Sequence, residues 1–276
     1  MNLQKIYVVA KKEFVDNFRN KWIIAMILIF VVLTMVASVF GGKGSIGGIE
    51  ETVTVLLGIA VILVPIISIM LGYATISGEV ENGSLPLLLS YPITRTEVLL
   101  GKFAGLSMVI VVATVAGFGI AGVLIVAAAG ATKIGSYLLF ILLTIMLGLV
   151  YLSLAVFFST LCSRRSTSLG LGILIFFWSS IYGTVVFGVF LATGGDFMAL
   201  ATGQGEVPAW MWYSMFLSPA DLTQTGVLRA FDVKKAFGHA LEPPAYMSLP
   251  AVLLAQIIWT VLPLVIGIWQ FNKRDV

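Results

Sequence analysis

Six long stretches of this chain contain no Asp, Glu, Lys or Arg, and this spacing of charge limits the fold more than any other feature. The charge-free windows are residues 22–42, 52–78, 103–132, 134–163, 166–195 and 243–272. A helix of about 20 apolar residues crosses a hydrocarbon core of about 30 Å, and each window is at least that long. Because helices that are apolar on all sides do not suit the outside of a soluble protein, we predict an all-α integral membrane protein with six transmembrane helices.

The composition agrees with lipid as the main solvent. Hydrophobic residues make up 59% of the chain and charged residues 11%, whereas soluble domains have about 25% charged residues. The first window is too long for a cleaved signal peptide and no A-x-A-like site closes it, so we expect it to be retained. The predicted spans are 22–40, 53–77, 98–129, 134–161, 168–193 and 249–271, within a single transmembrane domain covering residues 1–276.

Lysine and arginine near the helix ends set the orientation, because cytoplasmic loops carry an excess of both. With a cytoplasmic N-terminus, the short outer loops hold only Lys43 and Lys133. The inner side then holds Lys5, Lys11, Lys12, Arg19, Lys21, Arg95, Lys102, Arg164, Arg165, Lys273 and Arg274. We therefore predict a multi-pass protein of the cell membrane with both termini in the cytoplasm. The net charge of +3 reflects this topology rather than nucleic acid binding.

The segment before the first span, residues 1–21, has the pattern of an amphipathic helix. Its apolar side chains recur at helical spacing while its lysines fall on other faces. The apolar positions are Leu3, Tyr7, Ala10, Phe14 and Phe18. We expect an interfacial helix on the cytoplasmic surface, with its apolar stripe among the headgroups and its lysines toward anionic membrane lipid. A simple positive flank that fixes orientation is the alternative.

The extracytoplasmic segment 194–248 is too long for a simple connector between the fifth and sixth helices. It contains an aromatic cluster, Trp210, Trp212, Tyr213 and Phe216, and aromatic residues of this kind favour the headgroup level. Pro219 suits a first helical position with Ser218 as cap. Four apolar residues of the following run are expected to pack down onto the bundle: Leu222, Val227, Phe231 and Phe237. We expect one or two helices that lie on the outer surface rather than a separate domain.

The cytoplasmic loop between the second and third spans, residues 78–97, is the most informative one. Its apolar run is too short to cross a membrane, and a turn at Asn82-Gly83 precedes it. Pro92 ends the run, because the residue before a proline avoids the helical region. We predict a structured elbow at the inner surface, and a short exposed helix of this kind can transmit a push from a soluble partner.

The start of the third helix is marked by a capping box. Thr94 is followed three positions later by Glu97, so that each side chain can bond the backbone N–H of the other residue. The third helix should therefore begin near Arg95.

With this elbow the chain resembles the ABC-2 type permeases. That family shares an acid-x-acid-x-Gly-Ser/Thr pattern, a leucine-rich run, a proline, a Ser or Thr before Arg, and a Lys at the start of the third span. The pattern stands here as Glu79, Glu81, Gly83, Ser84, Leu87 to Leu89, Pro92, Thr94, Arg95 and Lys102. An Arg-Asn-Lys-Trp entry at 19–22, Ser218-Pro219-Ala220-Asp221 and the ending at 271–275 extend the resemblance over most of the chain. Length and loop sequence look most like the NosY-like branch, which is linked to copper-enzyme maturation.

The resemblance implies a type V exporter-like bundle that works as a homodimer with two copies of a separate ABC ATP-binding subunit. ATP and Mg would bind to that subunit. An extracytoplasmic accessory protein on 194–248 is also possible within the family. The ATPase-coupling residues that the resemblance implies are Glu79, Glu81, Gly83, Ser84, Pro92 and Arg95. Each has a local alternative: solvated loop charges for the glutamates, a turn residue for Gly83, and a positive anchor for Arg95.

Missing motifs separate the classes of function. The chain has no G-x-x-x-x-G-K-[ST] sequence, so the energy for transport is expected from outside. No acid stands in the six windows, which argues against an ion-coupled carrier. Because there is a single histidine, His239, and no base in a span, we predict no catalytic residue, no metal site and no cofactor. A passive channel or a scaffold without an ATPase is the alternative.

The substrate path of the predicted dimer is expected to be largely apolar. The hydroxyl and amide side chains available to face it are Ser68, Thr75, Ser179, Ser180, Thr184 and Gln256.

Overall fold

The computed structural model describes residues 2–40, 48–129, 134–202, 207–231, 235–236, 239–240 and 243–274. The longer helices are α1 (Leu3–Phe18), α2 (Lys21–Phe40), α3 (Gly48–Gly72), α6 (Arg95–Ala129), α7 (Ile134–Leu161), α8 (Arg165–Ala192), α11 (Pro219–Ala230) and α12 (Leu249–Lys273). The short ones are α4 (Ser77–Glu81), α5 (Leu85–Leu89), α9 (Phe197–Thr202), α10 (Ala209–Ser214) and η1 (Met215–Leu217). The two-residue strands β1 (Lys235–Ala236) and β2 (His239–Ala240) pair antiparallel.

Helices that can cross a membrane dominate the structure. Five stretches of the described chain are long and apolar enough: Val53–Glu81, Arg95–Val123, Ile134–Leu161, Arg165–Ala192 and Leu249–Lys273. Helices α1 and α2 meet at a bend of 69°, and this pair makes a sixth if it is counted as one span. The all-helical membrane architecture predicted from the charge-free windows is therefore confirmed at the level of five or six spans.

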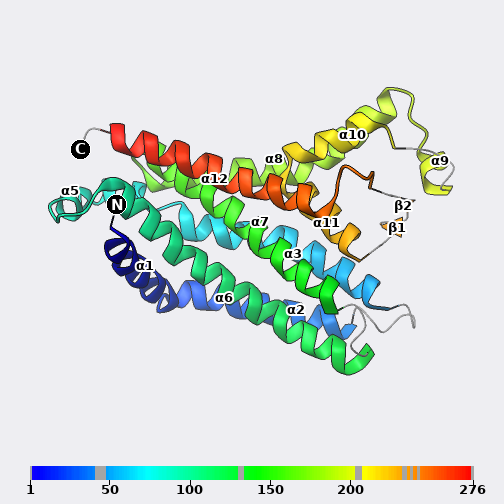
Figure 1. The fold of residues 1–276 in the computed structure, drawn as a ribbon, viewed down its shortest axis with the longest axis horizontal. Helices are drawn as coiled ribbons and strands as arrows, with labels where there is room; N and C mark the ends of the chain where they lie inside the picture. The colour runs from blue at the N-terminus through cyan, green and yellow to red at the C-terminus, as the bar shows by residue number, and fades with distance from the viewer. Residues whose placement is uncertain are drawn as a thin grey trace.

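Helix α7 runs through the centre of the bundle (Figure 1). It contacts α3, α6, α8, α11 and α12, and Phe140, Leu147 and Tyr151 are fully buried. An all-round apolar sequence makes this placement favourable, because every face of the helix finds an apolar neighbour. Helices α8 and α12 bury only 22% and 28% of their most apolar windows, against 67% for α7, so they lie on the outside of the single chain.

Both termini lie at one end of the bundle, together with α1 and α5 (Figure 1). We call this the basic end, because the side chains of Lys5, Arg95, Lys102, Arg165 and Arg274 gather there through the contacts described below. Helices α9 and α10 and the strand pair lie at the opposite end, here called the distal end.

The expectation for segment 194–248 needs a correction. Helix α11 does not lie on the bundle surface but packs among α7, α12, α8 and α3. Its apolar residues Leu222, Val227 and Phe231 are buried as expected, whereas Phe237 lies outside the described residues. Small side chains permit the insertion: at Gly226 of α11 an added Cβ would lie 2.9 Å from a methyl carbon of Val252. Ser218 caps α11 and Pro219 is its first residue, as predicted.

Candidate functional site

The base of the elbow is fixed to the inner part of α7. At the end of α3, an added Cβ on Gly72 would come within 2.7 Å of the Cβ of Ala155, so the two helices touch here because residue 72 has no side chain. The hydroxyl of Ser159 then accepts hydrogen bonds from the backbone N–H groups of Ile76 and Ser77, both at 2.9 Å. These bonds satisfy donors at the start of α4 that have no partner within the helix. The elbow therefore starts from a rigid point.

The turn inside the elbow is built by Gly83 and Ser84. Gly83 has φ +68°, a left-handed conformation that favours glycine. Its N–H donates to the carbonyl of Val80 at 3.1 Å, and the N–H of Ser84 donates to the carbonyl of Glu79 at 2.9 Å. This pair of bonds is the Schellman motif that ends a helix. The chain leaves α4 in a fixed direction and enters α5.

Helix α5 projects from the basic end beyond the other helices (Figure 1). Leu85 anchors it in the core, being 1% exposed, whereas Leu87 is 68% exposed and Tyr91 is 65% exposed. Two large apolar side chains at the tip of a rigid elbow are the kind of feature that inserts into a groove of a partner protein. We call Leu87 and Tyr91 the elbow tip.

A buried ion cluster holds the elbow to α1 and α6. The ammonium of Lys102 on α6 lies 2.7 Å from an oxygen of Glu13 on α1 and 2.7 Å from an oxygen of Glu79 on α4. Lys102 is only 5% exposed. Charges buried to this degree are stable only when they are paired. We call Glu13, Glu79 and Lys102 the ion cluster; Glu13 was not among the predicted site residues.

Two glycines of α6 bring α1 close enough for the cluster to form. An added Cβ on Gly101 would lie 2.6 Å from the Cβ of Val9, and one on Gly105 would lie 2.4 Å from the carbonyl oxygen of Ala10. No larger residue fits at either place without a shift of backbone or side chain. Their four-residue spacing within α6 is a sequence signal of close helix packing, but it does not distinguish Glu13 from Asp16, the other acid of α1.

Glu81 connects the elbow to the start of α8. Its Oε2 accepts hydrogen bonds from the backbone N–H of Arg165 at 2.8 Å and from Nε of the same residue at 3.2 Å. The guanidinium of Arg165 also donates to Oδ1 of Asn82 at 2.8 Å. A carboxylate at a helix N-terminus satisfies a free N–H and suits the helix dipole. Both side chains are partly exposed, so this contact can be broken and remade at low energetic cost.

Arg95 binds the C-terminal end of α12 instead of facing away from the protein. Its NH1 donates to the carbonyl of Phe271 at 2.8 Å and to the carbonyl of Arg274. Arg274 in turn donates to the carbonyls of Thr160 at 2.8 Å and Cys162 at 3.1 Å. The last carbonyls of a helix lack partners within it, and these two arginines satisfy them. They tie together the ends of α6, α7 and α12.

The stretch between α5 and α6 is held by α1. The ammonium of Lys5 donates to the carbonyl of Pro92. The predicted capping box is confirmed: the N–H of Thr94 donates to Glu97 at 3.0 Å, the N–H of Glu97 donates to Thr94 at 3.2 Å, and α6 begins at Arg95. Glu97 also accepts from the backbone N–H of Asn2 at 2.6 Å, which fixes the first turn of α1.

The six predicted coupling residues thus lie at one end of the molecule, and each serves to hold the elbow or a helix next to it. Glu79 belongs to the ion cluster and Glu81 binds α8, while Arg95 binds α12. Gly83 and Ser84 shape the turn. Glu81, Gly83, Ser84 and Pro92 are exposed beside the elbow tip, so the coupling role expected for these residues stays a prediction.

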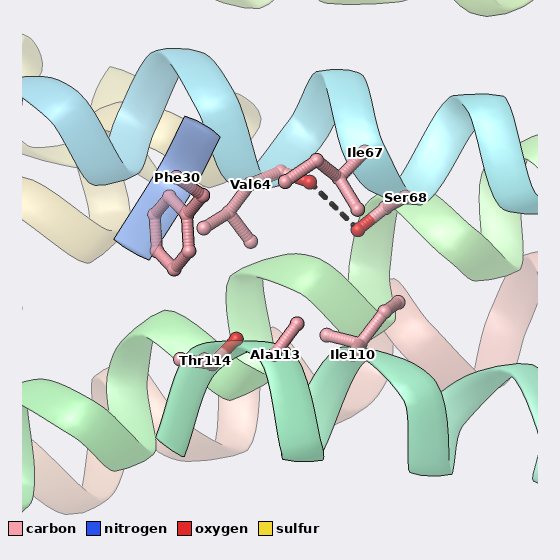
Figure 2. A pocket seen from close by; sticks show the side chains of 7 residues that line it. All are labelled: Phe30, Val64, Ile67, Ser68, Ile110, Ala113 and Thr114. Carbon is pink, nitrogen blue, oxygen red and sulfur yellow. Dashed lines mark hydrogen bonds between the residues drawn. The ribbon is translucent and has the colours of Figure 1, made fainter. Parts of the chain in front are cut away.

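The bundle contains a small cavity between α2, α3 and α6, but it is no transport path. Figure 2 shows Phe30, Val64, Ile67, Ser68, Ile110, Ala113 and Thr114 around it. Its volume is about 10 Å³, and a single water needs roughly 10–15 Å³. The Ser68 hydroxyl donates to the carbonyl of Val64 at 2.8 Å, as drawn in Figure 2. The cavity is therefore too small for any organic ligand.

Two of the six polar side chains that were expected to be available to a path are exposed in the single chain. Ser68, Thr75, Ser179 and Gln256 are buried inside the single chain, where they hydrogen-bond neighbouring groups; the amide of Gln256, for example, donates to Thr223 at 2.7 Å. Helical serines and threonines commonly bond the carbonyl one turn back. Ser180 and Thr184 of α8 are exposed.

The sequence is similar to those of known proteins over almost its whole length. A family model described as ABC-2 family transporter protein matches residues 7–276. A probable ABC transporter permease protein NosY of Pseudomonas aeruginosa is 31% identical over 282 residues, which cover 98% of this chain and 99% of the relative. A protein of the same name from Stutzerimonas stutzeri is 28% identical over 283 residues, covering 99% of each chain. The matched region includes the ion cluster, the elbow and α11.

Proposed function

This chain belongs to the ABC-2 family of transporter permeases, and we propose that two copies of it export a substrate across the cell membrane, driven by two copies of a separate ATP-binding subunit. The family and the two relatives support the role of a permease subunit. ATP and Mg bind to the partner in this proposal, since the chain has no G-x-x-x-x-G-K-[ST] sequence.

The observation that carries the proposal is the elbow tip on a fixed base. Leu87 is exposed on the projecting α5 and Tyr91 is exposed two residues after the end of that helix. The base of the same elbow is joined to α7 through Ser159, to α8 through Glu81, and to α1 and α6 through the ion cluster. A displacement of α5 by a partner is therefore passed to four helices at once, because packed interiors do not absorb strain locally.

In the membrane we place six spans, with α2 as the first and α1 along the cytoplasmic surface. The bend of 69° between α1 and α2 supports this arrangement. The lysines and arginines of the basic end support a cytoplasmic location of that end and of both termini. The elbow tip then faces the compartment in which ATP is available.

The substrate path lies between the two copies in this proposal. Ser180 and Thr184 on the exposed side of α8 are the polar groups that line it. Closure of the two ATP-binding subunits moves the two elbows together and shifts the pair of bundles between inward-facing and outward-facing arrangements. The likeness to two NosY proteins supports membership of that branch, and we extend the proposal to copper-enzyme maturation with an accessory protein on 194–248.

Co-purification tests the function. The tagged chain is isolated from membranes, and an ATP-binding subunit is identified by its phosphate-loop sequence and by ATPase activity. We expect it to co-purify with the wild-type chain and to be lost, by about tenfold or more, from a chain with Leu87→Ala and Tyr91→Ala, as for the central residues of an interface. Met198→Ala is the matched control, because Met198 is 66% exposed on α9 at the distal end.

A wild-type chain that carries no ATP-binding subunit, and whose membranes show no ATP-dependent transport, would overturn the proposal in favour of a channel or scaffold. Equal recovery of the ATPase with the elbow-tip variant would instead remove α5 from the interface while leaving the permease role intact.

A further inference from the structure

Helix α11 places an acidic side chain, Asp221, against α8, with one of its carboxylate oxygens, Oδ2, buried. The Oδ1 atom lies against the backbone of α8, where an added Cβ on Gly183 would come within 2.6 Å of it. Gly183 precedes Ala192, the last residue of α8, by 192 − 183 = 9 positions, which at about 1.5 Å per residue is about 14 Å. Asp221 is therefore far from the distal end of the spans, at a depth where they face the hydrocarbon core.

No positive charge accompanies this carboxyl group. None of the ion pairs found among the described residues involves Asp221, and its Oδ2 is buried without a hydrogen-bond partner. The nearest polar groups are hydroxyls: Ser218 accepts from the backbone N–H of Asp221 at 3.3 Å, and the hydroxyls of Ser218 and Ser179 are 3.1 Å apart. An ionised carboxylate in such surroundings is strongly destabilising.

Among the described residues, the ionisable group of a neighbouring helix that interacts with Asp221 is a phenol. Tyr151 of α7 is within electrostatic range of the carboxyl, and Tyr182 of α8 donates its hydroxyl to the carbonyl of Ser214 at 2.9 Å. The remaining charged groups of the elements packed on α11 stand toward helix ends: Glu50 and Glu51 of α3, Arg165 of α8, Lys273 of α12 and Arg229 of α11 itself. Arg229 is occupied by the carbonyls of Pro243 and Pro244.

We propose that Asp221 is a proton-binding site inside the bundle, and that the bound proton holds the first turn of α11 against α8. A protonated carboxyl carries no charge into the apolar interior and gains an O–H donor for a neighbouring oxygen. A metal ion does not suit the site, because Oδ1 already touches the α8 backbone, and the described residues contain no group of three His, Cys, Asp or Glu side chains. A proton needs no such room.

Two physical effects act on the group in opposite directions. Burial raises the pKa of the Asp221 carboxyl, and the hydrogen bond from Ser218 opposes this. The N-terminus of α11 also favours a negative charge, but the absence of a second donor on Oδ2 leaves burial as the larger effect. When the proton leaves, the unpaired negative charge destabilises the contact between the first turn of α11 and α8, so this turn is released. The inference adds a pH-sensitive element that the ATP-driven cycle does not require.

Infrared difference spectroscopy of the full chain in lipid bilayers at pH 7 tests this assignment. The wild-type spectrum minus that of Asp221→Asn should contain the carbonyl stretch of a protonated carboxyl group. Asp16→Asn is the control, because Asp16 is an exposed acid of α1, and its difference spectrum should contain carboxylate bands instead. In Gly183→Ala, the new Cβ displaces Oδ1 and should shift the carboxyl band or convert it to carboxylate.

A wild-type minus Asp221→Asn difference spectrum that contains carboxylate bands and no carboxyl band would overturn the proposal. If Asp221→Asn does not fold, Gly183→Ala provides the test. A carboxyl band that is the same in wild type and in Gly183→Ala would belong to another group, and this result would also overturn the proposal.

Discussion

The ammonium of Lys102 on α6 and the carboxylate of Glu13 on α1 form a buried ion pair, with Nζ and Oε1 2.7 Å apart. Glu79 of the elbow binds the same ammonium at 2.7 Å. One cation therefore joins three elements that are distant in sequence. In the proposed transporter, α1 and the elbow must move together when the ATP-binding subunit pushes on either of them.

Replacing Lys102 by methionine should be strongly destabilising. The change leaves two carboxylates close together without their cation, and removing one partner of a buried pair costs about 3–5 kcal/mol. We expect a clear fall in the thermal unfolding temperature in lipid nanodiscs. Lys12→Met is the control, because Lys12 is 67% exposed and its pair with Asp16 is at the surface. Equal unfolding temperatures for the Lys102 variant and the wild type would contradict a structural role of the cluster.

The two acids of the cluster should behave non-additively. In Glu13→Gln or Glu79→Gln, Lys102 keeps one carboxylate, so each single variant should lose about 1 kcal/mol or less of stability, whereas the double variant leaves the ammonium buried without a counter-charge. A double-mutant cycle should therefore give a coupling energy of about 1–3 kcal/mol. Additive losses would show that the two acids act independently, and coupling of α1 to the elbow would then need another route.

A side chain at position 105 of α6 should be destabilising, whereas a side chain at position 119 of the same helix should be tolerated. An added Cβ on Gly105 would lie 2.4 Å from the carbonyl oxygen of Ala10, whereas nothing lies within 4 Å of one on Gly119. We expect Gly105→Ala to cost about 1–3 kcal/mol through overpacking and to speed hydrogen exchange in α1. Gly119→Ala is the matched control and should be neutral or slightly stabilising. Unchanged exchange in α1 with Gly105→Ala would contradict the close contact.

A variant of Arg95 can distinguish a structural role of this residue from direct contact with the ATP-binding subunit. Arg95→Gln removes donors from the carbonyls of Phe271 and Arg274, so hydrogen exchange at the end of α12 should accelerate by about tenfold, equivalent to about 1.4 kcal/mol. The recovery of the ATP-binding subunit should stay within about twofold of wild type. Arg19→Gln, at an exposed position, controls for loss of charge. A selective loss of the ATPase with normal exchange in α12 would restore Arg95 to the interface.

The helices themselves could be predicted from the sequence because charge is excluded from the bilayer core. The long helices occupy the charge-free windows, and the start of α6 at Arg95 follows from the capping box of Thr94 and Glu97. These signals are local, so no knowledge of packing is needed. Helix α1 could be predicted from the helical spacing of its apolar residues, while its interfacial location stays a prediction.

The tertiary roles of the site residues could not be read in this way. Glu79 looks like a loop charge until Lys102 and Glu13 are brought together by the contact of α1 with Gly101 and Gly105. The insertion of α11 was missed because its polar sequence resembles a surface helix. Its polar groups are instead matched inside the bundle, as in the bond between Thr223 and Gln256 at 2.7 Å.

Cysteine labelling should show on which side of the membrane the elbow lies. In a Cys162→Ser background, a cysteine introduced by Leu87→Cys should react with a membrane-impermeant maleimide only in inside-out vesicles, because the basic end is proposed to be cytoplasmic. A cysteine introduced by Met198→Cys, on α9 at the distal end, should react only in right-side-out vesicles. Both residues are exposed, at 68% and 66%, so access of the reagent is comparable. The opposite pattern would invert the topology and remove the elbow from the side of ATP.

The pH dependence of stability should depend on Asp221. Burial raises the pKa of this carboxyl above its ordinary value of 3.8, so at pH values between 3.8 and the raised pKa the folded chain binds more protons than the unfolded chain. The unfolding free energy therefore falls as the pH rises through this window. Asp221→Asn removes that contribution, and all other groups cancel in the difference between the two proteins.

We expect the Asn variant to unfold at a higher temperature than wild type at pH 8, with a smaller or reversed difference at pH 5. Asp16→Asn should show a difference from wild type that hardly changes with pH. A constant difference for Asp221→Asn would mean that the folded state leaves the proton affinity of this group unchanged.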